Sequence, residues 1–255
     1  MINKKLVALA GLAALGLAMI PAGIISAEEV KTLDSNAKLT FTEDNSSKSP
    51  LDPTTPTNSD NTQNAISPID TVTGNTPNQG TVGPLSIDFA SSFNFGSHEI
   101  SSVSKIYKAL PQTYSQKTDS KATDTTGPNF VQVTDVRGGD FRGWTLRVKQ
   151  NGDFKSPSSS TLKGAVMTIN NGNVQNANGG TNTLSSVSKT ITVTTADSNV
   201  MGAKTGEGYG TWQYRMGEKD TAGTSVTLTV PGDTPRVAEA YTTTLTWTLS
   251  DTAVK

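Results

Sequence analysis

Strand-like alternation repeats along most of the chain after residue 84. Apolar or β-branched residues occupy every second position in these stretches, and glycine-rich clusters such as 137–140 and 178–180 separate them. Because side chains on a strand point alternately to two faces, each stretch has one face suited to a core. The predicted strands cover residues 85–89, 130–135, 143–150, 162–169, 189–194, 211–216, 225–230 and 241–249.

This pattern predicts an all-β fold, either an antiparallel β-sandwich or a partly closed barrel. A parallel α/β sheet is disfavoured, because its strands would be continuously apolar rather than alternating. Only residues 100–110 suggest a single short helix.

The first 27 residues have the pattern of a secretory signal peptide. Two lysines precede an apolar run over residues 6–20, and small residues end the segment at Ala27. We expect cleavage after Ala27, which leaves no integral membrane span. An uncleaved membrane anchor is the alternative, although Pro21 interrupts the far end of the apolar stretch.

The mature chain divides into a short N-terminal segment (28–44), a linker (45–84) and a β domain (85–255). The linker contains six prolines among Asn, Ser, Thr and Asp, a composition that buries little apolar surface. Within the N-terminal segment, residues 37–42 alternate like a strand. Because a lone strand is unstable in water, we expect this one to pair with the β domain across the linker; a disordered tail is the alternative.

Composition excludes several classes of function. The chain has no cysteine and a single histidine, His98, so the usual zinc sites are excluded and a hydrolytic triad is hard to build. Absence of disulfides favours a Gram-positive bacterial exterior. Residues 28–83 hold three basic and eight acidic side chains, and residues 84–255 hold 16 basic and 14 acidic, so nucleic-acid binding is not expected. We expect no cofactor.

Two functions that need only carboxylates or other oxygen ligands, glycoside hydrolysis and calcium binding, stay open on composition. A glycosidase needs only two of them, although most acidic residues here fall in turn-like stretches where they are ordinarily solvated. Loop oxygens between Asp135 and Asp140 could hold calcium, but the dense ligand spacing of a calcium loop is missing. We therefore predict no catalytic residue and no metal site.

Two of the three tryptophans lie in the same tripeptide, Trp144-Thr145-Leu146 and Trp247-Thr248-Leu249. With period two, the Trp and Leu of each copy share one strand face. Core packing is the expected role of both tryptophans, and direct ligand contact is the alternative. The third tryptophan, Trp212, shares a face with Tyr214 and is a candidate aromatic surface for sugars, with core packing as the alternative.

These motifs resemble the WxL-domain surface proteins of low-GC Gram-positive bacteria. The similarity includes Leu39-Thr40-Phe41-Thr42 before the linker, and it extends over essentially the whole mature chain. At the distal motif, members usually carry a proline four residues after the leucine, and Ala253 stands there instead.

The resemblance implies a secreted protein that attaches non-covalently to the cell wall through peptidoglycan. It also implies other cell-surface proteins as partners, including larger WxL proteins and anchored proteins, so that the chain is a small structural or interaction subunit and not an enzyme. A secreted carbohydrate-active enzyme and an adhesin for host or plant polymers are the alternatives. The resemblance assigns wall binding to the motif residues, which either contact the ligand or support the binding domain structurally. They are Trp144, Thr145, Leu146, Tyr241, Leu245, Thr246, Trp247 and Leu249.

Overall fold

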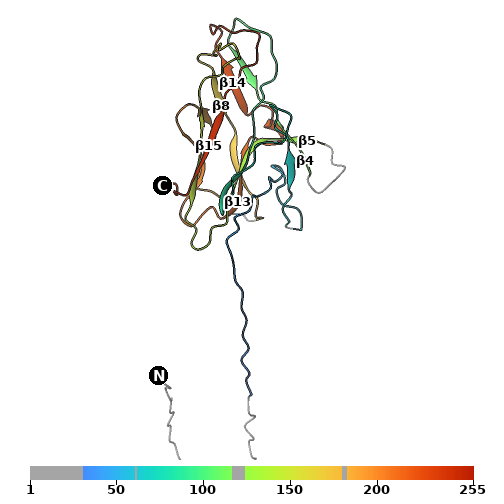
Figure 1. The fold of residues 1–255 in the computed structure, drawn as a ribbon, viewed down its shortest axis with the longest axis vertical. Coiled ribbons are helices and arrows are strands. Elements are labelled where there is room, and N and C mark those ends of the chain that lie inside the picture. Colours follow the sequence, from blue (N-terminus) through green and yellow to red (C-terminus); the bar gives the residue numbers. More distant parts are fainter. Residues whose placement is uncertain (1–30, 61, 117–123, 180–182) are drawn as a thin grey trace, which may run out of the picture. The chain divides into compact units, whose positions relative to one another are not determined.

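The computed structural model describes residues 31–60, 62–116, 124–179 and 183–255. The chain forms two units, residues 1–41 and residues 42–255. The predicted signal peptide lies outside the described residues. All the strands described below belong to the second unit (Figure 1).

Four antiparallel sheets make up the second unit, which confirms the predicted all-β fold. One sheet has the order β2-β6-β13-β9 (Leu85–Ala90, Asn129–Asp135, Gly210–Met216, Gly172–Asn176). A second has the order β10-β12-β7-β15 (Ser186–Val187, Ser198–Ala203, Trp144–Gln150, Leu245–Ser250). A third has the order β11-β8-β14-β3 (Ile191–Val193, Val166–Ile169, Val226–Val230, Lys105–Lys108). The smallest has the order β1-β4-β5 (Ile66–Pro68, Gln112–Gln116, Thr125–Gly127).

The three four-stranded sheets share one hydrophobic core. The inward-facing residues of each sheet alternate with outward ones, as the sequence pattern predicts, and the core collects the inward set from all three sheets. Its fully buried members include Val131, Val133, Leu146, Val148, Ile169, Val200, Tyr214 and Met216. Strand β6 is buried along its whole length, so its second face must also be covered.

Residues that the sequence predicts to be a linker cover that second face. Leu51 and Ile66 are buried, and Ile66 packs with Phe89 and Phe130 in a small second core beneath the β1-β4-β5 sheet. The Gln132 side chain accepts a hydrogen bond from the Leu51 amide at 2.9 Å. The segment therefore differs from the extended linker expected, because a few apolar side chains and a buried glutamine hold its backbone despite the prolines.

The strand predicted over residues 37–42 is not formed. Residues 31–45 carry no strand, and the Leu39 and Phe41 side chains are 77% and 87% exposed. The alternation in this segment therefore did not predict its structure, since alternation produces a strand only where a partner supplies hydrogen bonds.

The short helix considered for residues 100–110 is also wrong. Lys105–Lys108 form strand β3, which pairs with β14 at the edge of its sheet. Several strands were missed, among them β4, β9 and β12, because their polar or glycine-containing sequences form strands only through pairing with neighbours. Over the part of the chain that is described, no helix is long and apolar enough to cross a membrane.

Candidate functional site

The two W-x-L motifs lie on neighbouring strands of one sheet. Strand β7 carries the first and is central, and β15 carries the second and forms the sheet edge. The strands pair antiparallel, with Leu249 opposite Leu146 and Trp247 opposite Val148. The structure therefore brings together motifs that are about a hundred residues apart in the sequence. We call this β10-β12-β7-β15 sheet the motif sheet.

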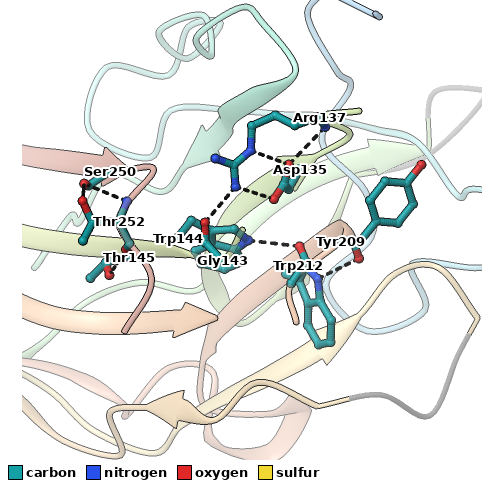
Figure 2. Close-up of polar contacts among 10 residues, drawn as sticks. Asp135, Arg137, Gly143, Trp144, Thr145, Tyr209, Trp212, Ser250 and Thr252 are labelled. Carbon is teal, nitrogen blue, oxygen red and sulfur yellow. Dashed lines mark hydrogen bonds and ion pairs between the residues drawn. The ribbon is translucent and has the colours of Figure 1, made fainter. Parts of the chain in front are cut away.

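The first tryptophan is a core residue. Trp144 is 0% exposed, and its indole N–H donates a hydrogen bond of 3.0 Å to the Gly208 carbonyl (Figure 2). Gly208 has a φ of +84°, and a Cβ built there would lie 2.5 Å from the Trp144 indole nitrogen. The Trp144 ring thus fills the interior and holds the 204–209 loop in place. This is the core-packing role expected for the tryptophan of the first W-x-L motif.

A buried ion pair supports the start of strand β7. The Arg137 guanidinium bonds both carboxylate oxygens of Asp135, at 2.9 and 2.7 Å, and donates to the Gly143 carbonyl at 2.8 Å (Figure 2). Hydrogen bonding to Asp135 raises the pKa of Arg137. Because Asp135 is engaged by Arg137 while Asp140 is exposed, the two carboxylates considered for calcium have different roles.

Residues after β15 return across the motif sheet. The Thr145 hydroxyl donates to the Thr252 carbonyl at 2.7 Å (Figure 2), and the Val254 amide donates to the Ala203 carbonyl at 3.1 Å. A Cβ added at Gly143 would lie 2.8 Å from the Ala253 Cβ. Thus Ala253 lies close against the residue that precedes the first motif.

The second tryptophan has a different environment. Trp247 is only partly buried, and it lines two adjoining surface hollows of about 530 and 390 Å³ between β15 and β2. Both strands end their sheets, so the hollows follow an open seam between two sheet edges. We call the larger hollow the seam groove. Its apolar lining consists of Val72, Ile87, Phe89, Ala90, Phe93, Phe95, Phe154, Met167, Leu245 and Trp247.

The other residues of the second motif, on β15 and just before it, support the position of this strand. Leu245 and Leu249 are partly buried against the main core, as is the Tyr241 ring. The Tyr241 hydroxyl donates to Ser160 at 2.9 Å and accepts from the Val237 amide at 2.8 Å. The Thr246 hydroxyl donates to the Asn151 side chain at 3.0 Å. These contacts fix the edge strand without covering the seam groove.

The aromatic surface predicted at Trp212 and Tyr214 is wrong, because both rings are buried. The Trp212 indole N–H donates to the Tyr209 carbonyl at 3.2 Å (Figure 2). The Tyr214 hydroxyl donates to the Ser188 carbonyl at 2.8 Å, and burial raises the pKa of Tyr214. Strand β13 is central in its sheet and covered on both faces, so its aromatic residues have no solvent-facing side.

His98 and Asp70 are both held in local interactions. The His98 ring packs against the Tyr107 ring in a tilted arrangement, and its Nε2 forms a hydrogen bond of 2.6 Å with the Phe95 carbonyl. The seam groove has one carboxylate in its lining, Asp70, which accepts hydrogen bonds from Val72, Thr73 and Ser92. Among the residues that the structure describes, no group of three or more His, Asp or Glu side chains could hold a metal ion.

The fold and site define an all-β domain organised around two paired W-x-L motifs. The chain belongs to the WxL domain family, described as surface cell wall-binding, and the match covers residues 28–253. This is a family of binding domains and not of enzymes. No curated protein and no solved structure matches the chain significantly.

Sequence reasoning missed most of the seam groove. The Phe93 and Phe95 side chains and residues 78–81 line it, but they come from loops without alternation. It also missed a stacked aromatic pair, Phe141 and Tyr209, on two loops beside the first motif. Glycines on both sides of these aromatics indicate turns, and nothing in the sequence pairs the two turns.

Proposed function

We propose that this secreted protein attaches non-covalently to peptidoglycan and acts there as a small structural or interaction subunit of a cell-surface complex. Membership of a surface cell wall-binding family supports wall attachment. The family match begins at residue 28, directly after the expected signal-peptide cleavage point, which supports secretion.

The observation that carries the proposal is the position of Trp247. Its ring is partly exposed at an open sheet edge and borders both hollows, while its counterpart Trp144 is enclosed in the core. An aromatic face beside hydroxyl and amide groups suits a sugar ring, which has both an apolar face and polar edges. The groove supplies those polar groups through Asn78, Gln79, Thr81, Ser92, Thr243, Thr244 and Thr246.

Sedimentation with purified peptidoglycan tests this function. We expect the mature chain to sediment with the sacculi and Trp247→Ala to sediment several-fold less. Because part of the Trp247 ring packs on the core, each variant is first checked by thermal unfolding and far-UV circular dichroism. The matched control is Ile106→Ala, which changes an exposed apolar residue on strand β3, outside both hollows.

The proposal is wrong if the folded wild-type chain stays in the supernatant. If a folded Trp247→Ala variant sediments as well as the Ile106→Ala control, wall binding stands but the seam groove is not its contact.

A further inference from the structure

Two exposed aromatic rings stack on each other beside the first motif. Phe141 and Tyr209 are 44% and 49% exposed, with ring centroids 4.9 Å apart and planes inclined by 20°. The stacked rings together present an apolar face to solvent, which suits a ligand that has an apolar face of its own. We call this pair the aromatic platform.

Two buried tryptophans hold the backbone under the platform. The Tyr209 carbonyl accepts from the Trp212 indole, and the carbonyl of the preceding Gly208 accepts from the Trp144 indole (Figure 2). The Gly206 amide then donates to the Phe141 carbonyl at 2.8 Å, which ties the two loops together. In Figure 2 the Tyr209 ring points away from both tryptophans. The loops are therefore held in place before any ligand arrives, which lowers the entropy cost of binding.

The charges around the platform balance, because the buried Arg137 of the first loop is already paired with Asp135. Arg142 and Lys204 are cationic, whereas Asp140 and Glu207 are anionic. The Glu207 carboxylate is held by the Ser185 hydroxyl and amide, and these hydrogen bonds lower the pKa of Glu207 so that it is ionised. A balanced rim creates no strong field of one sign, so it favours a neutral ligand over an anionic polymer.

We propose that Phe141 and Tyr209 form a stacking site for a pyranose ring of a neutral amino-sugar chain. The apolar C–H face of the sugar would lie on an outer ring face, and its hydroxyl and acetamido groups would reach the charged rim. Two rings are too small an area for a stable protein interface, which buries about 800 Å² on each partner. The site is distinct from the seam groove and rests on the proposed wall attachment.

Titration of the full mature chain with chitotetraose, followed by amide chemical shifts, tests the inference. We expect the shifts to centre on the 137–143 and 204–209 loops and on the Trp212 indole N–H. The double variant Phe141→Ala/Tyr209→Ala should bind about tenfold more weakly, with an unchanged far-UV spectrum. Tyr209→Phe keeps the ring and should bind like wild type, and Ile106→Ala is the surface control.

The same variants in the sacculus assay separate this inference from the proposed function. If the wild-type chain sediments but the double variant binds tetrasaccharide and sacculi equally well, the platform assignment is wrong and wall attachment stands. If the wild-type chain sediments but gives no shifts with tetrasaccharide, a neutral amino-sugar chain is excluded as the ligand. A wild-type chain that binds neither overturns both proposals.

Discussion

Leu146 and Leu249, the leucines of the two W-x-L motifs, lie directly opposite each other on strands β7 and β15. The motif is therefore one structural feature in two sequence segments. The two motif segments pair the edge strand β15 with the central strand β7. Because β7 is central and β15 is the edge, Trp144 is buried in the core and Trp247 is partly exposed to solvent.

Truncation after Pro235 should abolish the native fold, although it leaves most of the core sequence intact. It removes β15 and the returning segment that bonds Thr145 and Ala203. Leu146 and Val148 would then lie beside an exposed sheet edge. We expect strong binding of a hydrophobic dye and loss of a cooperative thermal transition. A truncated chain that unfolds cooperatively near the wild-type temperature would contradict this.

The two motif tryptophans should differ in their effect on stability. Trp144→Ala removes a fully buried ring and its hydrogen bond, and should lower the free energy of unfolding by about 3–5 kcal/mol. Trp247→Ala should cost about 1–2 kcal/mol, because part of the ring already contacts solvent. Urea unfolding measures both values, and equal losses would show that exposure does not distinguish the two sites.

Gly208 should tolerate alanine far less well than Gly206 does. Both have positive φ, +84° and +90°, so alanine costs about 1–2 kcal/mol of backbone strain at either position. Only at Gly208 would the added methyl collide with Trp144, since nothing lies within 4 Å of a Cβ at Gly206. We expect a clearly lower melting temperature for Gly208→Ala than for Gly206→Ala. Similar melting temperatures would mean that the loop moves away from the tryptophan.

Asp52 should make stability depend on pH in the acid range. Burial alone would raise its pKa, but hydrogen bonds from Thr54, Thr55 and Gln116 outweigh this and lower the pKa below 3.8. The ionised carboxylate therefore stabilises the fold above pH 3.8, and this contribution is lost as the pH falls through the lowered pKa. Asp52→Asn should be less stable than wild type at pH 7, with the difference shrinking in acid. Urea unfolding at several pH values measures it, and a constant difference would rule out this linkage.

The sequence predicted the strands that carry a regular apolar alternation, at sheet centres and at edges alike, and missed strands with polar or glycine-containing sequences such as β4 and β12. Strands β7 and β13 have an apolar residue at every second position of their sequences, which is the pattern that predicts a strand. Residues 45–84 contain few apolar side chains, yet Leu51 and Ile66 are enough to hold their segment because Gln132 and Gln213 bond the Leu51 backbone. The average composition of residues 45–84 therefore could not predict that two apolar residues would hold this segment against the β domain.

For the candidate site, local pattern identified the motif residues but not their different environments. Trp144 and Trp247 have the same local sequence, and strand position alone makes one central and the other peripheral. Alternation likewise could not show which aromatic residues face solvent. Trp212 lies in a regular strand and is buried, whereas Tyr209, three residues earlier, lies in a loop and is exposed.

The pairing of β7 with β15 also has a kinetic consequence. The Thr145–Thr252 contact joins residues 107 positions apart, so the motif sheet is completed only by closing a very long loop. Folds dominated by such distant pairings fold in about milliseconds to seconds, far more slowly than helical bundles. Until β15 arrives, β7 presents an open apolar edge to other chains. The separation of the two motifs therefore sets how long this chain stays vulnerable to aggregation while it folds.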